Sequence, residues 1–300
     1  MNGNLNQVSV DVRINPIMSM CIALLSLFPI IGCFADEPEE TYTWDLNSDW
    51  QKQKLNGQVK TLAEVRYNIP INPYEEEVQP EFDMSFVYEF NKDGFIKFQS
   101  SHDEDGNVKD LDLFFYDEDG RIEKVWFDIK GKPSGGTLLF KYNKNGKLIA
   151  LQSEKESGEL SVKVFYKLDD KDNVVEESSW SSSGELFSKK EYIRNDKGEI
   201  IKVLSYDSYG KLKSEIDYVR DENGVIVERI KYEQESDTNE RCRYEYDENG
   251  NVVKSIISDE NGREQEIETS YTYDKYGNWV EKIEQHGLFS YYYKREIEYY

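Results

Sequence analysis

The sequence contains few of the side chains that most often carry catalysis and metal binding. It has two histidines, His102 and His286, and three cysteines, Cys21, Cys33 and Cys242. No His-x-x-x-His, Cys-x-x-Cys or Gly-x-Ser-x-Gly pattern is present, so neither a zinc site nor a nucleophile–histidine pair is indicated. Both histidines lie near expected turns, and we expect them to be exposed turn residues.

Carboxylates are abundant, and two kinds of chemistry must be weighed for them. A glycosidase needs a pair of carboxylates, but most of those present fall in expected turns or on solvent-facing strand positions. The Asp-Glu-Asp-Gly stretches at 103–106 and 117–120 resemble calcium loops, yet Ser101 and Phe115 stand where an EF-hand requires Asp. We therefore predict that the protein is not an enzyme and has no metal site and no cofactor.

Basic residues and prolines are also scarce. Lys and Arg total 37 against 60 Asp and Glu, which gives a net charge of −23. A surface this acidic repels phosphate backbones and anionic lipid head groups, so we expect no nucleic-acid partner. The chain has only 7 prolines but 22 tyrosines, and this composition favours strands over helices or disorder.

One long apolar run is present, at residues 17–31, and it follows Arg13. The run is too short to span a bilayer comfortably as a permanent helix, and it fits the apolar region of a signal peptide. It ends in Ile30-Ile31-Gly32-Cys33, which resembles the lipobox of bacterial lipoproteins. The resemblance implies cleavage before Cys33 and acylation of Cys33, and two or three acyl chains anchor a protein stably. An ordinary export signal with an incidental cysteine is the alternative.

The residues after Cys33 are acidic, in the order Phe34-Ala35-Asp36-Glu37-Pro38-Glu39-Glu40. This stretch resembles the signal that sends Bacteroidetes lipoproteins to the cell surface, and a solvated acidic tether is the alternative. The expected organisation is a signal peptide at 1–32, an acidic tether or linker at 33–55 and a repeat domain at 56–300. We expect a lipoprotein anchored in the outer membrane. Whether it faces the cell surface or the periplasm stays open, and so does whether translation starts at Met1 or at Met18.

A repeat with a period of about 26 residues organises the chain from position 56 onward. Its marker is the glycine of a Tyr-Asp-x-x-Gly-like turn, and Asp172 fills the single gap in the series. The step between markers is constant, except that the last step is one residue longer. The marker glycines are Gly94, Gly120, Gly146, Gly198, Gly224, Gly250 and Gly277.

Three positions of the repeat keep their chemical character. The position six before the marker is always aromatic, and we call it the repeat aromatic column: Tyr88, Phe114, Phe140, Tyr166, Tyr192, Tyr218, Tyr244 and Tyr271. The position two after the marker is always apolar: Ile96, Ile122, Leu148, Val174, Ile200, Ile226, Val252 and Trp279. The position four before it includes two arginines, whose stems can cover apolar surface: Phe90, Tyr116, Tyr142, Leu168, Arg194, Arg220, Tyr246 and Tyr273.

The turn chemistry predicts how these positions meet. Asp opens a type I turn, and Gly supplies the left-handed residue of a G1 bulge. This geometry sets Tyr246 opposite Val252, and likewise Tyr116 opposite Ile122 and Tyr142 opposite Leu148. Each aromatic–aliphatic pair across two strands stabilises the sheet by roughly 0.2–1 kcal/mol.

A second turn falls about half a period later, often at a glycine such as Gly106 or Gly262, so each repeat is a hairpin. We predict an all-β fold of repeated antiparallel β-hairpins, with about sixteen strands in meander order. The residues three positions after the marker, such as Ile149 and Val253, are also apolar. We therefore expect the sheet to be elongated and to curl on itself, or to pack its second face.

The segment Tyr273-Asp274-Lys275-Tyr276-Gly277-Asn278 resembles the Rhs/YD repeats of bacterial surface proteins. The repeat of this chain has a longer period than is usual for those repeats. The alternation is also similar to MORN repeats of antitoxin-type proteins. The segments 55–60 and 64–67 resemble the first strand of uncharacterised lipoproteins that carry such repeats. These resemblances imply a β-repeat scaffold and no reaction.

The combined expectation is a cell-envelope lipoprotein that acts as a non-catalytic binding or scaffold module. It would be held to the membrane by its lipid anchor and would bind an unknown protein or carbohydrate ligand. The alternative is an immunity or antitoxin-like protein that binds a toxin. A transmembrane barrel is disfavoured by the lipobox and by charges on both strand faces. Cys242, the one unmodified thiol of the mature chain, is expected to be a small buried hydrophobe.

Overall fold

The computed structural model describes residues 49–70, 79–129, 135–287 and 289–300. The chain divides into two units, 1–36 and 37–300, and every described residue belongs to the second. The lipobox residues Ile30–Cys33 and most of the expected tether lie outside the described residues. In the described part of the chain, no helix combines the length and the apolar character that crossing a bilayer requires.

A four-residue helix, α2 (Asp49–Lys52), precedes one sheet of 18 antiparallel strands. The strands are β1 (Val59–Pro70), β2 (Glu81–Phe90), β3 (Ile96–His102), β4 (Val108–Tyr116), β5 (Ile122–Ile129), β6 (Gly136–Tyr142), β7 (Leu148–Lys155), β8 (Leu160–Leu168), β9 (Val174–Ser181), β10 (Leu186–Arg194), β11 (Ile200–Tyr206), β12 (Leu212–Arg220), β13 (Ile226–Glu233), β14 (Thr238–Tyr246), β15 (Val252–Asp259), β16 (Glu264–Tyr273), β17 (Trp279–Gln285) and β18 (Phe289–Tyr299).

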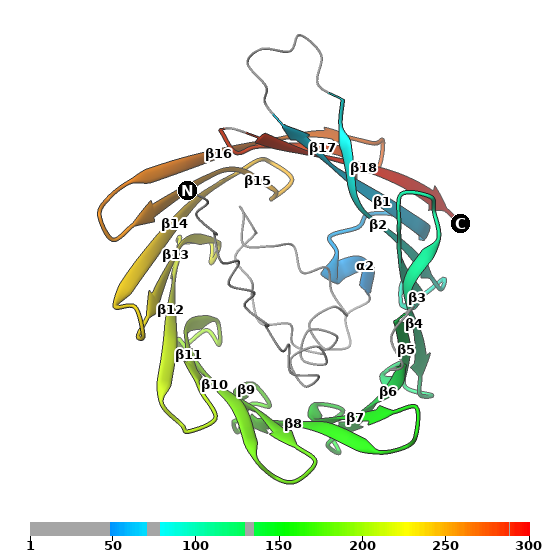
Figure 1. Cartoon of the computed structure of the whole chain (residues 1–300), viewed down its shortest axis with the longest axis vertical. Helices are drawn as coiled ribbons and strands as arrows, with labels where there is room; N and C mark the ends of the chain where they lie inside the picture. The colour runs from blue at the N-terminus through cyan, green and yellow to red at the C-terminus, as the bar shows by residue number, and fades with distance from the viewer. Residues whose placement is uncertain (1–48, 71–78, 130–134, 288) are drawn as a thin grey trace, which may run out of the picture. The chain divides into compact units, whose positions relative to one another are not determined.

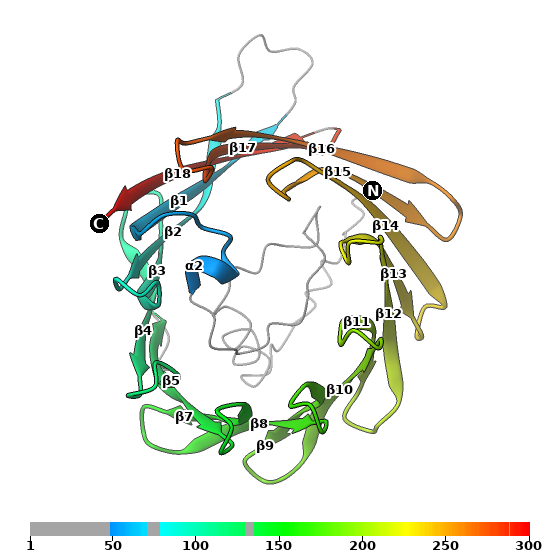
Figure 2. The ribbon, with the colours of Figure 1, turned by 180° about the vertical axis from the view of Figure 1, so that it is seen from behind.

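The sheet is closed into a barrel (Figures 1 and 2). Strand β1 pairs with β2 on one side and with β18 on the other, so that Leu62 faces both Tyr88 and Ile297. The expectation of all-β repeated hairpins is confirmed, but that of an open, elongated and curled meander with about sixteen strands is wrong. The repeat pattern yields only β2 to β17, whereas β1 and β18 close the ring and remove both free edges.

The turns have the predicted chemistry. In the turn after β14, the Gly250 amide donates to the carbonyl of Asp247 over 3.1 Å, and the Asn251 amide donates to the Asp247 side chain over 2.9 Å. Gly250 has φ +78°, and Asp172 adopts the same left-handed region with φ +62°. The predicted pairing of Tyr246 with Val252 is confirmed.

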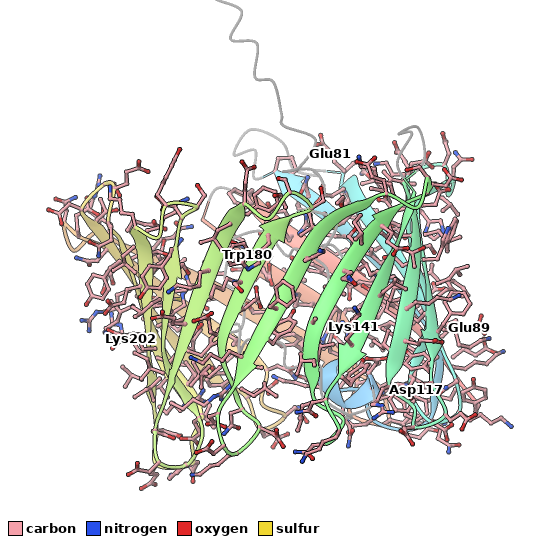
Figure 3. The ribbon with its side chains drawn as sticks, turned by 90° about the horizontal axis from the view of Figure 1, so that it is seen from below. Glu81, Glu89, Asp117, Lys141, Trp180 and Lys202 are labelled. Atoms are coloured by element: carbon pink, nitrogen blue, oxygen red, sulfur yellow. The ribbon has the colours of Figure 1, made fainter. Side chains whose placement is uncertain are left out.

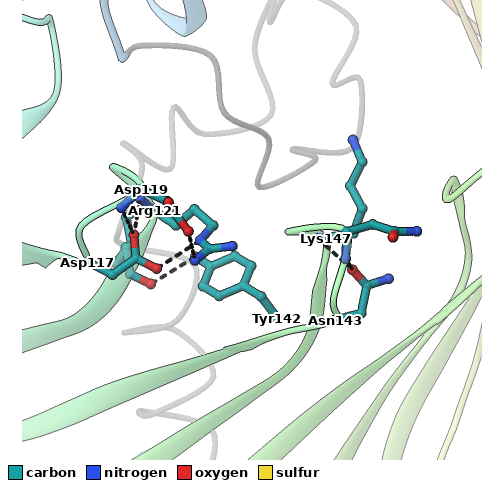
Figure 4. Close-up of polar contacts among 8 residues, drawn as sticks. Asp117, Asp119, Arg121, Tyr142, Asn143 and Lys147 are labelled. Atoms are coloured by element: carbon teal, nitrogen blue, oxygen red, sulfur yellow. Dashed lines mark hydrogen bonds and ion pairs between the residues drawn. The ribbon is translucent and has the colours of Figure 1, made fainter.

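Neighbouring turns are linked by side chains at this end of the barrel (Figure 4). The Arg121 guanidinium donates to Asp117 over 2.8 Å and also bonds Asp119 in its own turn. Its Cζ atom lies 5.4 Å from the ring centre of Tyr142, which belongs to the next hairpin. The turn ends are therefore held by contacts between repeats as well as within them.

Helix α2 identifies the inner face of the barrel, because it lies within the ring of strands (Figures 1 and 2). Its Trp50 packs against Phe90, and its Asp49 carboxylate accepts a 2.7 Å hydrogen bond from the Ile96 amide. The sequence pattern assigns residues 49–55 to the tether, yet Asp49 and Leu55 are buried. The three repeat positions share the face that α2 touches, so they line the inside of the barrel.

The apolar residues three positions after the marker have another role than expected. The sheet register shifts beside them at each first turn, as between Lys141 and Tyr142 opposite Leu148 and Ala150, where Ile149 is the extra residue. They therefore occupy β-bulges, where one strand carries an extra residue, and Ile149 at this position is 36% exposed. These residues therefore do not mark a packed second face. Bulges bend the strands that carry them, which agrees with the other alternative, a sheet that curls on itself, here as far as closure.

Candidate functional site

The position four before the marker provides a ladder of hydrogen bonds on the inner wall. The hydroxyl groups of Tyr116, Tyr142 and Tyr246 donate to the backbone carbonyls of Ile96, Ile122 and Ile226, 20 residues earlier, over 2.6–2.8 Å. The two arginines at this position donate in the same way. Arg194 donates to the Val174 carbonyl over 3.3 Å, and Arg220 donates to the Ile200 carbonyl over 3.2 Å.

This ladder explains why tyrosine and arginine can replace each other in the repeat. Both are long side chains with a donor at the tip, and a buried backbone carbonyl without a donor costs about 1–3 kcal/mol. The sequence interpretation considered only the stem of the arginines. The constant separation between each donor and the apolar position of the preceding repeat was the signal that could have revealed the ladder.

The repeat aromatic column lies beside the ladder. Tyr88, Phe140, Tyr192, Tyr218 and Tyr244 are at most 8% exposed. Phe114 is partly buried against the cluster that contains Tyr88 and Phe90, while Tyr166 and Tyr271 are half-buried. The column thus forms part of the wall, and its rings are largely covered.

Cys242 belongs to the core cluster that contains Tyr192, Tyr218 and Tyr244. It is 3% exposed, which confirms the expectation of a small buried hydrophobe. Its neighbour Tyr244 has a pKa raised by burial and then by the nearby Cys242 thiol. The phenol therefore stays neutral at physiological pH, and it cannot serve as an activated nucleophile.

A group of buried charged side chains lies on the inner wall where the barrel closes. We call it the seam cluster. Its residues come from β1, from β17 with the residue after it, and from β18, and the β1 residues join the others because the first and last strands pair. Its members are Glu64, Arg66, Trp279, Lys282, Glu284, His286, Tyr293 and Arg295. Apart from Trp279, their side chains are 14% exposed or less.

Tyr293 is the centre of the seam cluster. It faces Arg66 across one strand boundary and Lys282 across the other. The Lys282 ammonium lies 3.9 Å from the centre of the Tyr293 ring, and the Arg66 Cζ lies 6.0 Å from it. A cation near the face of a desolvated ring is attracted by its quadrupole, so each side of the seam contributes a cation–π contact.

Glu284 receives three polar contacts. The Tyr293 hydroxyl donates to it over 3.0 Å, the Lys282 ammonium lies 2.7 Å away, and the His286 Nε2 lies 3.6 Å away. Burial alone would raise the pKa of Glu284, but the contacts with His286, Lys282 and Tyr293 outweigh it and hold the pKa below its ordinary value. Glu284 is therefore an ionised acceptor rather than a general acid.

His286 contradicts the expectation of an exposed turn residue. Its side chain is completely buried, and its ring stacks on Phe289 with 5.0 Å between ring centres and 6° between planes. The turn after β17 is short, with the His286 amide donating to the Phe289 carbonyl over 2.9 Å, so His286 is still on the wall when the chain reverses. His102 on β3 is half-buried.

The third part of the seam cluster is an ion pair stacked on a ring. The Arg295 Nε lies 2.7 Å from the Glu64 carboxylate, and the Arg295 Cζ lies 3.4 Å from the centre of the Trp279 ring. Glu64 and Arg295 are 231 residues apart in the chain. The seam cluster fixes the register of β1 and holds the aromatic rings in place. Its two carboxylates, Glu64 and Glu284, are each paired with a cationic side chain of the cluster.

The outer wall of β11 to β16 is covered with charged pairs. On the face opposite the aromatic column, Lys202 lies 3.1 Å from Asp217 and also bonds Glu215. Further round the barrel, Arg241 pairs with Glu228 at 3.0 Å, and Lys254 pairs with Glu266 at 2.7 Å. Charged side chains at the middle of several strands require water outside this part of the wall, since a lipid-facing band is apolar.

No grouping of three or more His, Cys, Asp and Glu side chains suited to a metal ion occurs among the described residues. Cys33 and the lipobox residues Ile30, Ile31 and Gly32 lie outside them, so the lipidation site stays a prediction. The closure of the described strands defines the class of fold: an 18-stranded antiparallel barrel built from hairpin repeats.

Several solved structures are similar to this chain. A porin-like protein from Bacteroides uniformis matches with 12% identity and a TM-score of 0.44, over 81% of this chain and 99% of that one. The complex TcdB2-TccC3-Cdc42 matches with 13% identity and a TM-score of 0.38, over 73% of this chain but 14% of that one. An outer membrane lipoprotein-sorting protein domain from Vibrio parahaemolyticus matches with 8% identity and a TM-score of 0.20, over 85% and 92%. No family model and no curated protein matches the chain.

Proposed function

We propose that the protein is a cell-envelope lipoprotein whose closed barrel is a non-catalytic binding or scaffold module. The observation that carries this proposal is the distribution of charge. The outer wall of β11 to β16 has ion pairs at mid-strand, such as Arg241 with Glu228, which suits a barrel surrounded by water. A water-surrounded barrel reaches a membrane through an anchor, and Cys33 at the end of the leader provides one.

The seam cluster, as one part of the inner wall, supports a role without catalysis. In the seam cluster, Glu284 is held ionised by His286, Lys282 and Tyr293, while burial and the nearby Glu284 raise the pKa of Tyr293. General acid–base catalysis needs groups that change protonation near the working pH. A ring of fixed aromatic and ionic contacts instead suits a rigid module that presents its surfaces and rims to a partner.

The lipid anchor is tested by replacing Cys33 with Ala in the native host. After a high-salt wash of the membranes, which releases proteins held only by charge, we expect the wild-type protein in the membrane fraction and Cys33→Ala in the soluble fraction, because no acyl chain can be attached to alanine. Cys21→Ala, a change within the leader, is the matched control and should leave the fractionation unchanged. Unchanged membrane association of Cys33→Ala would contradict the proposal.

The binding role is tested by a pull-down from envelope extract with the acylated protein as bait. A specific protein or polysaccharide retained after a high-salt wash would support it. Recovery of a basic toxin would support the immunity alternative instead. Intact cells treated with an external protease would separate a surface location, where the barrel is digested, from a periplasmic one.

A further inference from the structure

The outer wall of β3 to β8 differs chemically from the rest of the barrel exterior. Cross-strand partners place Phe98 beside Leu113, Leu113 beside Trp126, and Phe115 beside Lys124 on the outer face. The same face continues with further residues, and we call the whole set the lysine–aromatic wall: Phe98, Leu111, Leu113, Phe115, Lys124, Trp126, Leu139, Lys141, Lys163, Phe165 and Lys167. Figure 3 shows part of this wall, with Lys141 of β6 labelled on it.

The side chains of this wall are accessible. Phe115 is 41% exposed and Phe165 is 46% exposed, whereas most rings of the repeat aromatic column on the inner wall are buried. The Lys124 ammonium lies 4.6 Å from the centre of the Phe115 ring. Burial of such exposed rings against a partner would remove apolar surface from water, which is favourable.

The charge of the wall is opposite to that of the protein. Within the described part of the chain, no carboxylate lies at ion-pair distance from Lys124, Lys141, Lys163 or Lys167. The carboxylates on this face lie at its margins, on the neighbouring strands or near the second turns: Glu89, Asp128, Glu154 and Glu176. Lys167 lies opposite Glu176 and its charge also acts on Glu191. A chain of net charge −23 therefore presents Lys124, Lys141 and Lys163 on one wall with no carboxylate at ion-pair distance in the described part of the chain.

We propose that the lysine–aromatic wall docks onto an anionic lipid surface, an inference that rests on the membrane location in the proposed function. Interspersed lysine and aromatic side chains are what binds at the boundary between head groups and acyl chains. The core of a protein–protein interface is instead depleted in lysine. Six strands spaced about 4.8 Å apart give the wall a width of about 24 Å, enough to touch several lipids at once.

The docked barrel lies on its side against the membrane. The lysines meet lipid phosphates, and Phe115 and Phe165 reach the head-group region. The charged wall of β11 to β16 then points away from the bilayer. The two walls together orient the protein, because lysines free of carboxylate partners are attracted to an anionic surface, whereas lysines already paired with carboxylates are not.

The test uses the full chain carrying Cys33→Ser, so that acylation makes no contribution to binding. By flotation, we compare its partition onto vesicles of phosphatidylcholine mixed with phosphatidylglycerol, an anionic lipid, against vesicles of phosphatidylcholine alone. Each lysine near an anionic surface contributes a factor of about five to binding. The variant Lys124→Gln/Lys141→Gln/Lys163→Gln should therefore bind the anionic vesicles on the order of 100-fold more weakly.

The matched control is Lys294→Gln, an exposed lysine at mid-strand on the outer face of β18, outside the wall. It should bind like the parent chain, and all variants should bind neutral vesicles alike. A triple variant that binds anionic vesicles as strongly as the Lys294→Gln control would overturn the lipid proposal. So would a triple variant that loses self-association or an acidic protein partner while vesicle binding is unchanged.

The tests of the two proposals can be told apart. Cell fractionation of Cys33→Ala tests whether the acyl chain anchors the protein. Loss of lysine-dependent vesicle binding concerns the wall and is seen with a chain that cannot be acylated. Circular dichroism of the triple variant, with a β-sheet spectrum and thermal midpoint close to the parent's, excludes misfolding as the cause.

Discussion

At the scale of the single residue, the protein depends on donors and acceptors placed on a wall of otherwise apolar side chains. The hydroxyl of Tyr116 satisfies the carbonyl of Ile96, and Arg220 does the same for Ile200. Aromatic and aliphatic identities at these positions could be predicted from the repeat. The hydrogen-bond targets could not, because each lies in the preceding hairpin, and only the pairing of strands places it within reach.

Asp112 provides a residue-scale prediction of pH dependence. Burial raises the pKa of Asp112 to about 6, and the Asp110 charge adds to the rise, while a 2.7 Å hydrogen bond from Gln99 opposes it. The folded state therefore binds its proton more tightly than the unfolded state, whose carboxyl titrates at about 3.9. Stability is lost as the pH rises from about 4 through about 6, and the loss persists above that.

The substitution Asp112→Asn removes this ionisation and keeps an oxygen that can accept from Gln99. We expect a gain in the free energy of unfolding of up to about 2 kcal/mol at pH 7.5, after allowance for partial solvent access, and almost none at pH 4. Urea unfolding of both proteins at the two pH values measures the difference. An equal effect at pH 4 and pH 7.5 would show that the ionisation of Asp112 is not its cause.

At the scale of the element, β1 is the strand that the repeat does not predict. It lies before the first marker glycine, yet it contributes Leu62, Glu64 and Arg66 to contacts with β18. The resemblance of residues 64–67 to a first strand indicated its position. Its partner could not be inferred, because β18 lies at the other end of the chain and nothing in the local pattern encodes a pairing over that distance.

The ion pair between Glu64 and Arg295 gives a prediction for this element. Both side chains are at most 14% exposed, so removal of one partner leaves a charge with no compensation inside the wall. We expect Glu64→Gln or Arg295→Gln alone to cost about 3 kcal/mol of unfolding free energy, and the double variant to cost less than the sum of the two. A denaturation-based double-mutant cycle measures the coupling.

The exposed pair Lys60–Glu298 on the same two strands is the control for that cycle. Its side chains are 42% and 58% exposed, and we expect a coupling of at most about 0.5 kcal/mol. If the coupling free energy of the buried pair were no larger than that of this exposed pair, the ion pair of the seam cluster would not be what stabilises β1 between β2 and β18.

At the scale of the whole molecule, closure decides how the protein behaves in solution. An open sheet of hairpins has two edges with unpaired backbone groups, and such edges pair with other chains. In the barrel, β1 covers the edges of both β2 and β18. The distribution of charge over the outer wall also depends on the closed barrel, because the barrel decides which residues of the eighteen strands face outward together.

Deletion of the chain through Pro70 removes β1 and tests closure directly. We expect the shortened protein to form dimers or larger species, since β2 and β18 then present free edges, whereas the parent chain stays monomeric. Light scattering after size-exclusion chromatography measures the mass of each. A shortened chain that remained monomeric, with its β-sheet spectrum intact, would mean that β2 and β18 pair directly and that β1 is dispensable.

The hairpin repeat, its turn chemistry and the pairing of Tyr246 with Val252 could be predicted without coordinates, because each depends on residues that are close together in the chain. Closure of the barrel, the burial of His286 and the meeting of Glu64 with Arg295 became visible only in three dimensions. So did the separation of a lysine–aromatic wall from a wall of ion pairs in a chain whose overall charge is negative. These features escape local patterns because curvature accumulates over eighteen strands, and the partners it finally brings together lie at opposite ends of the chain.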